Sequence, residues 1–365
     1  MELEYNNKSS CADVLLNAAQ YNQFDKITMD SCLIFGENFC ALSSLLKTHK
    51  GKIDLIYIDP PFNTNQVFGV TENRKNAISR SKKSLTAYSD EMSRTEYLEF
   101  IRKRLILLKE LLSEEGSIYL HIDTKVGHYI KIIMDEVFGE ENFKNDITRV
   151  KSNPKNFSRT AYGNEKDVIY FYAKNYKKNI WNEVRIPIEK KDIEKRFPKI
   201  DKNGRRYTTI PLHAPGETNG VTGQPWRNMN PPAGRHWRTN PEEFDRLDSL
   251  GLIEWSVNGN PRIIKYADEN AGKKIQDIWY FKDPQNPLYP TEKNLDMLKL
   301  IVNQSSNVGS IVLDCFCGSG TTLVAAEESG RKWIGIDSSE IAVNTVKGRK
   351  ELKEYRFYKC LDYAE

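Results

Sequence analysis

Cysteine is scarce in this chain, with six among 365 residues, and no two cysteines are spaced as C-x-x-C. This pattern argues against a zinc ribbon and a disulfide scaffold, and it favours a reducing cytoplasmic compartment. No apolar run approaches the roughly 18 residues that a membrane span requires. The opening MELEYNNKSSCADVLL has acidic residues where a secretory signal has a basic flank. We therefore expect neither a secretory leader nor a membrane anchor.

Histidine is rare as well: five residues, too scattered to predict a metal site. Apolar residues make up 39% of the chain and charged residues 28%, which excludes wholesale disorder. At about 150 residues per domain, the length leaves room for more than one domain.

The net charge of +4 conceals an uneven distribution. Between Lys144 and Asn240, 21 Lys and Arg stand against 9 Asp and Glu, whereas the rest of the chain is acidic. A positive excess confined to one segment predicts a surface for a polyanion, although a solvated charged face would show the same composition.

Strand and helix patterns alternate at both ends of the chain. The expected strands are 53–58, 117–123, 167–173, 310–314, 333–337 and 356–361. The expected helices are a long one that begins after Ser93 and is stopped by Gly116, and the segments 124–138, 291–302, 321–329 and 339–353. Ser93 and Glu96 form a capping box before the first of these helices. Such alternation is typical of an α/β fold with a mostly parallel sheet covered on both faces.

Two segments interrupt the alternation. Residues 63–93 are polar and basic without periodicity, as in a loop. Residues 176–280 are rich in Pro, Gly, Asn, Arg and Trp, with one helix expected near 242–250. We interpret the latter segment as an inserted recognition region. The predicted domains are thus residues 1–175, the insertion 176–280, and residues 281–365.

The segment SIVLDCFCGSGTT, residues 310–322, reads as a strand, a glycine turn and a helix start. Gly318 and Gly320 let the backbone approach a ligand closely, and Asp337 ends the next strand, where a carboxylate can accept ribose hydroxyls. The third glycine of the dinucleotide fingerprint is missing, which favours a nucleoside cofactor without phosphates. A plain strand-to-helix turn is the structural alternative.

The tetrapeptide Asp59-Pro60-Pro61-Phe62 follows an apolar strand, at the end where open α/β sheets bind ligands. The prolines remove two backbone donors and leave carbonyl groups exposed. Together with the Asp59 carboxylate they offer only acceptors, which suits an amino group, and the Phe62 ring could stack on a planar base. A turn stiffened by proline is again the structural alternative.

The DPPF tetrapeptide (59–62) and the D-x-F-x-G-S-G-T-T loop (314–322) together resemble the S-adenosylmethionine-dependent DNA amino-methyltransferases, which modify adenine N6 or cytosine N4. Their order resembles the β-order subgroup, which includes the modification subunits of type III restriction systems. The Thr291-Glu292-Lys293 segment is similar to its Pro-Thr-x-Lys element. The chain departs from the family pattern at Cys315, Tyr289 and Asn294.

The resemblance implies a Rossmann-like methyltransferase fold and a role for each candidate residue. Asp59 and the Pro60 carbonyl would accept the hydrogens of the target amine, with Pro61 shaping the turn and Phe62 stacking on a flipped base. S-adenosyl-L-methionine would be held by residues on both sides of the glycine turn: Asp314, Phe316, Gly318, Gly320, Asp337, Thr291 and Lys293. Asp362 is expected to be a surface carboxylate, with contact to the adenine ring of the cofactor as the alternative, and His121 and Asp123 are expected to be structural.

Double-stranded DNA is the predicted partner, with a cognate restriction endonuclease and a second copy of the chain as further candidates. The residues predicted to contact DNA are Arg205, Arg206, Arg227, Arg235 and Arg238. Adenine N6 is favoured over cytosine N4 because the residue before Pro-Pro is Asp, where the cytosine enzymes more often have Ser. A nicotinamide-dependent oxidoreductase and a DNA-binding protein without turnover are the competing classes.

Overall fold

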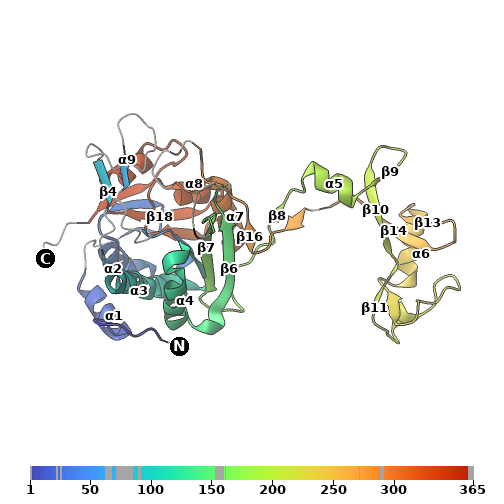
Figure 1. Cartoon of the computed structure of the whole chain (residues 1–365), viewed down its shortest axis with the longest axis horizontal. Coiled ribbons are helices and arrows are strands. Elements are labelled where there is room, and N and C mark those ends of the chain that lie inside the picture. Colours follow the sequence, from blue (N-terminus) through green and yellow to red (C-terminus); the bar gives the residue numbers. More distant parts are fainter. Residues whose placement is uncertain are drawn as a thin grey trace. The chain divides into compact units, whose positions relative to one another are not determined.

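A computed structural model describes residues 2–21, 24, 27–61, 68–70, 85–88, 92–152, 160, 162–270, 272–285, 287 and 292–360. The chain divides into two compact units. The first comprises Met1–Val184 with Gln276–Glu365, and the second comprises Arg185–Ile275 (Figure 1).

The first unit is built on a large sheet. Across its described residues the strand order is β16 (Ile278–Trp279), β6 (Phe143–Val150), β7 (Lys166–Ala173), β5 (Leu112–Ile122), β2 (Ile53–Ile58), β17 (Ile311–Asp314), β18 (Lys332–Asp337), β1 (Cys32–Phe35) and β19 (Arg356–Lys359). Strand β7 is antiparallel to both of its neighbours, and the other pairings are parallel. The prediction of a mostly parallel α/β sheet is confirmed.

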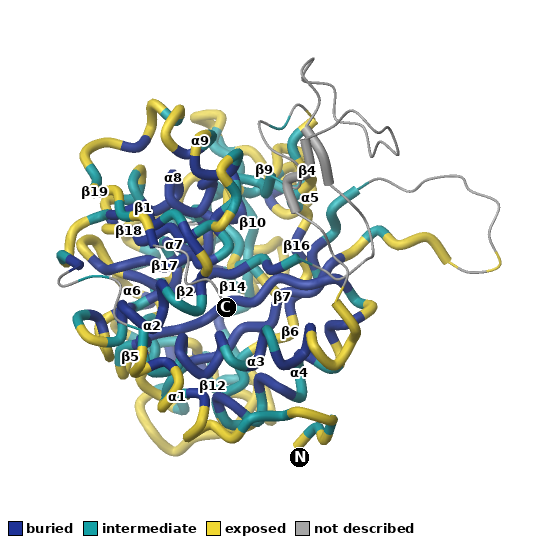
Figure 2. Tube along the Cα trace, turned by 90° about the vertical axis from the view of Figure 1, so that its left-hand side faces the viewer, coloured by how far each residue is buried: buried dark blue, intermediate teal, exposed yellow. Residues whose placement is uncertain are grey.

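Helices cover both faces of this sheet. One face carries α1 (Cys11–Gln20), α2 (Asn38–His49), α3 (Arg94–Leu111) and α4 (Thr124–Phe138), and the other carries α7 (Leu295–Ser305), α8 (Thr321–Glu328) and α9 (Glu340–Lys347) (Figure 1). The central strands are buried along their length (Figure 2). Burial on two faces explains why IDLIYI is almost uninterrupted in its apolar character. None of the described helices is long and apolar enough to cross a membrane.

Helix α3 begins where the sequence predicts it. The Ser93 side chain accepts from the Glu96 N–H, and the Glu96 carboxylate accepts from the Ser93 N–H at 2.9 Å. These reciprocal bonds satisfy backbone donors that the first helical turn leaves unpaired. Before it, in the segment predicted as a loop, β3 (Phe68–Val70) pairs antiparallel with β4 (Leu85–Tyr88), so the loop prediction was wrong for those residues.

The topology places two loops beside one another. Strands β2 and β17 are adjacent and parallel, so their carboxyl ends lie at the same edge of the sheet. From β17 the chain passes through α8 to β18 on one side, whereas from β2 it passes through α3 to β5 on the other. Connections that leave in opposite directions open a crevice at the switch point, where α/β sheets bind ligands.

The second unit has a sheet of its own. Its described elements are β8 (Arg185–Ile186), α5 (Lys190–Arg196), β9 (Lys199–Ile200), β10 (Arg206–Pro211), β11 (His213–Pro215), β12 (Arg235–Trp237), α6 (Pro241–Ser249), β13 (Ile253–Trp255), β14 (Pro261–Tyr266) and β15 (Lys273–Lys274). Strands β13, β14, β10 and β9 form an antiparallel sheet. A separate core packs beneath it, formed by Leu212, Trp226, Trp237, Phe244, Ile253 and Ile263.

The boundaries of this unit differ from the predicted insertion 176–280. Ile278 pairs with Thr148 and Trp279 with Arg149, so β16 belongs to the large sheet. Trp279 is 4% exposed there. Helix α6 lies where a helix was expected, but the surrounding sequence forms short strands rather than irregular structure. Strands this short show too few alternations to give a sequence pattern. The functional division into three segments stays a prediction.

Candidate active site

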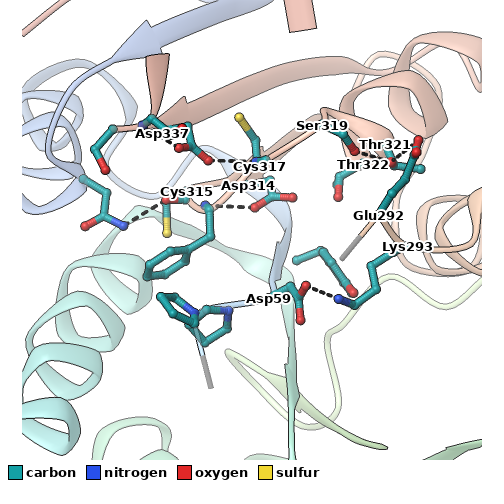
Figure 3. A pocket seen from close by; sticks show the side chains of 18 of the residues that line it. Asp59, Glu292, Lys293, Asp314, Cys315, Cys317, Ser319, Thr321, Thr322 and Asp337 are labelled. Carbon is teal, nitrogen blue, oxygen red and sulfur yellow. Dashed lines mark hydrogen bonds and ion pairs between the residues drawn. The ribbon is translucent and has the colours of Figure 1, made fainter. Parts of the chain in front are cut away.

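A cavity of about 290 Å³ lies at the carboxyl ends of β2 and β17 (Figure 3). The residues that line it are Glu37, Asn38, Tyr57, Asp59, Pro60, Pro61, Phe100, Glu292, Lys293, Leu298, Asp314, Cys315, Phe316, Cys317, Gly318, Ser319, Thr321, Thr322, Asp337, Ser338 and Ser339. The sequence segments that suggested chemistry, distant along the chain, therefore meet at one place in the first unit.

Asp59 comes directly after β2 and projects into the cavity. Its Oδ2 pairs with the Lys293 ammonium, and Figure 3 shows the two side chains pointing toward one another. Its Oδ1 is buried and accepts no hydrogen bond from any described residue; the His121 ring nitrogen Nδ1 lies 3.9 Å away. A buried acceptor without a donor is unfavourable, so Oδ1 is poised to accept one from a bound group.

The glycine turn is closed by its own hydrogen bonds. Gly320 has φ +76°, and a Cβ atom there would lie 2.9 Å from Val346 Cγ2, so only glycine fits without strain. The amides of Cys317 and Gly320 donate to Ile336 O and Cys317 O, at 3.1 and 2.7 Å. Those of Phe316 and Gly318 donate to the carboxylates of Asp314 and Asp337. Amides committed in this way cannot cradle a pyrophosphate, which counts against a nicotinamide dinucleotide.

Asp337 holds the turn against the following helix. It accepts the Gly318 N–H at 2.8 Å on one carboxylate oxygen and the Ser339 N–H at 2.8 Å on the other. Burial raises the pKa of Asp337, and these backbone donors partly offset that effect. Asp337 lines the cavity, and Figure 3 shows its carboxylate near Cys317. Its predicted contact with ribose would use its remaining lone pairs.

Asp314 is the most perturbed carboxyl group of the cavity. Burial raises its pKa to about 7; hydrogen bonds from Thr322 and the Phe316 amide act in the opposite direction, and the nearby negative charge of Asp59 adds to the rise. A carboxyl group this close to neutral pH responds strongly to a cationic ligand, because a positive charge favours the ionised form.

One wall of the cavity was missed by the sequence interpretation. Asn38, at the start of α2, donates to Cys315 O at 2.9 Å and accepts from the Arg104 guanidinium. That guanidinium also pairs with Glu37 and lies 3.4 Å from the centroid of the Phe100 ring. The available signal was weak: β1 ends at Phe35, and Gly36 and Glu37 follow it before α2, much as Asp59 follows β2.

The predicted site residues divide into three groups. Those that line the cavity are Asp59, Pro60, Pro61, Asp314, Phe316, Gly318, Asp337 and Lys293. Gly320 shapes the turn behind it as the N-cap residue of α8. Phe62, Thr291 and Asp362 lie outside the described residues, as does Tyr289. Asp123 caps α4 by accepting the Lys125 N–H at 2.8 Å. Asn294, where the family usually has Pro, caps α7.

The arginines predicted to contact DNA all belong to the second unit. They differ in whether a carboxylate lies close enough to neutralise their charge. Arg205 pairs with Asp268 and Glu269, and Arg227 with Asp245 and Asp248. Arg206 lies 3.6 Å from Glu194.

In contrast, no carboxylate of the described residues pairs with Arg235 or Arg238, and both are exposed. They lie near His213 and Arg262. Burial lowers the pKa of His213, and the charges of these three arginines lower it further. Of the five predicted arginines, the two that have no carboxylate partner among the described residues therefore lie near His213.

Comparison with known proteins identifies the family. The profile of the N6/N4 DNA methylases matches residues 53–348, which contain both the Asp59 loop and the glycine turn. The chain belongs to the DNA methylase family. Members of this family use S-adenosylmethionine as methyl donor. The methylase is 42% identical over 332 residues to the type II methyltransferase M.EcaI of Enterobacter cloacae, covering 88% of this chain and 70% of that protein.

More distant relatives belong to both type II and type III systems. The EcoPI Mod subunit of Escherichia phage P1 is 26% identical, over 86% of this chain and 58% of its own length. M2.DpnII of Streptococcus pneumoniae is 24% identical, over 95% of this chain and 97% of its own length. The methylase thus spans a little over half the length of the type III subunit that it matches. Among solved structures, the M1.HpyAVI–SAM complex has a TM-score of 0.45 and 18% identity, over 87% of this chain and 98% of that one.

The described residues include no cluster of three or more His, Cys, Asp or Glu able to hold a metal ion. The donor set of the cavity suits an organic cation instead: Asp59, Asp314 and Asp337 surround it, with the Phe316 and Phe100 rings 6.1 Å apart at its side. S-adenosylmethionine carries a sulfonium, an ammonium and two ribose hydroxyls, all of which are groups that carboxylates can pair with.

The Asp314 carboxyl predicts a pH dependence of cofactor binding. Since burial raises its pKa to about 7, a proton must leave when the cationic cofactor binds below that pH. We expect the affinity for S-adenosylmethionine to rise by up to about tenfold per pH unit below 7 and to level off above it. Calorimetric titration at pH 6, 7 and 8 measures this. The Asp314→Asn variant, titrated at the same pH values, shows how much of the pH dependence comes from ionisation of the cofactor itself. If the affinities of the wild type and the variant change with pH in the same way, the prediction is contradicted.

Proposed function

We propose that this methylase transfers a methyl group from S-adenosylmethionine to the exocyclic N6 of adenine at a specific site in double-stranded DNA. The observation that carries the proposal is the Oδ1 of Asp59, which accepts no hydrogen bond from any described residue and is buried in the wall of a cavity that also contains the glycine turn. An amino group supplies the donor that this oxygen lacks.

The chemistry requires orientation more than basicity. The lone pair of an exocyclic amine is delocalised into the ring, so the nitrogen is a poor nucleophile. Asp59 and the Pro60 carbonyl would each accept one amine hydrogen, which turns the lone pair toward the sulfonium methyl. The new bond joins nitrogen to this carbon while the carbon–sulfur bond breaks, and the nitrogen then loses one proton. Acceptors fixed in place stabilise the positive charge that develops on nitrogen.

A base in a duplex cannot reach a cavity of this kind, so the target nucleotide must leave the helix. Extrusion costs a few kcal/mol, which stacking on an aromatic ring and contacts to phosphates offset. Phe62 is the proposed stacking platform. The second unit, with its uncompensated arginines, is the proposed DNA-recognition region.

N4 of cytosine is the alternative target, because its amine presents the same two donors to Asp59 and Pro60. The relatives named as parts of restriction-modification enzymes support a cognate endonuclease as functional partner; a homodimer is a further proposal. Sequencing of DNA from a host that expresses the methylase, with detection of modified bases, distinguishes the two bases and reveals the site. Unmodified DNA together with an inactive purified protein would refute the proposal.

The charge distribution of the second unit predicts which arginines bind DNA. We expect the affinity for DNA to fall steeply with salt, with a log–log slope of about −0.9 per neutralised phosphate. Replacing Arg235 and Arg238 by alanine should weaken DNA binding. It should also make the log–log slope less negative, by an amount that corresponds to at most about two neutralised phosphates. The same replacement of Arg205 and Arg227, which are already paired with carboxylates, should have a smaller effect.

Fluorescence anisotropy over a salt series measures both double variants, with a cofactor titration as the control for folding. A flat salt response in the wild type, or equal slopes in the two variants, would show that the positive excess is a solvated face. DNA recognition would then have to involve the basic residues 74–83, which lie outside the described residues.

A further inference from the structure

A line of buried polar side chains runs from the cavity across neighbouring strands. The Tyr57 hydroxyl on β2 lies 2.9 Å from His121 Nδ1 on β5. His121 Nε2 lies 3.3 Å from Asp167 Oδ2 on β7, and Lys151, just after β6, donates to Asp167 Oδ1 at 2.6 Å. The Tyr57, His121 and Asp167 side chains are all nearly inaccessible to solvent. Buried polar side chains are costly unless each of them is hydrogen-bonded, so the geometry of this line of side chains is well defined.

The charges of this line decide which atoms donate. Burial disfavours the ionised form of Asp167, but the hydrogen bond from His121 and the charge of Lys151 outweigh it and lower its pKa. Burial lowers the pKa of His121, which is therefore neutral at physiological pH. An ionised carboxylate only accepts, so His121 Nε2 carries the proton. Nδ1 then accepts, and the Tyr57 hydroxyl donates to it.

The consequence appears at the cavity. With its proton committed to His121, the Tyr57 oxygen offers only lone pairs on its other side, and Tyr57 lines the cavity. Asp59 Oδ1, the unpartnered acceptor, lies 3.9 Å from the same His121 nitrogen. Tyr57 thus adds a second acceptor to the residues that line the cavity, and the direction of its hydroxyl is set by His121 and Asp167, which do not line it.

We propose that Tyr57 is a specificity-determining residue of the transfer reaction and that His121 and Asp167 are positioning residues that hold its hydroxyl oxygen as an acceptor toward the target amine. The inference rests on the proposed function. It extends that function because an acceptor wall attracts the amino groups of adenine and cytosine and repels the keto oxygens of guanine and thymine. The same lone pairs stabilise the charge that develops on the attacked nitrogen.

The test begins with Tyr57→Phe, which removes only the oxygen. Its matched control is Tyr119→Phe: Tyr119 pairs with Tyr57 in the sheet register, is equally buried and bonds Ser305 at 2.7 Å, but does not line the cavity. In single-turnover methylation of a duplex with the mapped site, we expect Tyr57→Phe to react about tenfold or more slowly, with cofactor affinity within about twofold of the wild type. Tyr119→Phe should react at the wild-type rate.

Asp167→Asn tests the positioning role from a distance. The asparagine can donate to His121 Nε2, which would move the imidazole proton to Nδ1 and turn the Tyr57 O–H toward the cavity as a donor. We expect a loss of rate like that of Tyr57→Phe, without a change in the KM for the cofactor. The double variant should be no slower than the slower single variant, because both changes act through one hydroxyl.

Specificity is measured with a duplex in which hypoxanthine replaces adenine at the target position, so that a keto oxygen replaces the amine. The wild type should bind this duplex more weakly than the adenine duplex, and Tyr57→Phe should narrow the difference. A wild-type rate for Tyr57→Phe, additive losses in the double variant, or an unchanged binding ratio would overturn the inference. A wild type that transfers no methyl group to any DNA would refute the proposed function instead.

Discussion

Asp59→Ala is expected to lower the rate of methyl transfer at least about 10²-fold, the scale on which a preorganised hydrogen-bonding partner contributes to catalysis. The variant removes the unpartnered Oδ1 that would accept the target amine. Cofactor affinity should change far less than the rate, because Asp314, Phe316 and Asp337, assigned to the cofactor, lie on β17, β18 and the glycine turn. Lys293, also assigned to the cofactor, loses its partner Asp59, which limits any change to its own contact. Single-turnover rates and calorimetric titration of S-adenosylmethionine measure the two effects separately.

Two controls make this test specific. Asp59→Asn keeps the size of the side chain and one acceptor, so it should retain more activity than alanine only if its amide oxygen faces the amine. Asp54→Asn changes a carboxylate on the same strand that bonds Ser113 at 2.8 Å outside the cavity, and it should react at the wild-type rate. An Asp59→Ala variant that keeps more than about a tenth of the wild-type rate would contradict the assignment of Asp59.

Asp337→Ala is expected to weaken S-adenosylmethionine binding by about 10²-fold or more, with catalysis affected second. The change removes the proposed ribose acceptor and also leaves the Gly318 and Ser339 amides without their partner. An unpaired buried donor costs about 1–3 kcal/mol, so the glycine turn loses its defined shape as well as a ligand contact. Equilibrium titration of cofactor at constant pH measures the affinity.

Asp337→Asn distinguishes the two causes. Its amide oxygen can accept one of the two backbone donors but cannot receive ribose hydroxyls as a carboxylate does, so its affinity should lie between those of wild type and alanine. Thermal unfolding without cofactor reports any damage to the fold. Unchanged cofactor affinity in the alanine variant would refute the ribose role. A large fall in melting temperature together with a large loss of cofactor binding would show that Asp337 acts only through the fold.

Local patterns in the sequence predict those parts of the methylase whose physical cause is local. Prolines after an apolar run end β2 at Ile58, just before Asp59, and glycine is required where the turn before α8 takes a positive φ. Ser93 and Glu96 start α3 by satisfying backbone donors within one helical turn. Each signal acts over a few residues, which is why β2, the glycine turn and the start of α3 could be predicted without tertiary information.

Tertiary structure decided what depends on residues distant in the chain. The adjacency of β2 and β17 brings Asp59 to the glycine turn, and the pairing of Lys293 with Asp59 follows from the same strand order. The Glu37–Asn38 wall was missed because a strand of only four residues carries little periodicity.

Composition likewise could not show that Asp268 neutralises the charge of Arg205, whereas Arg235 lies beside His213. Charge compensation is a property of distances between side chains, and only the folded chain defines those distances.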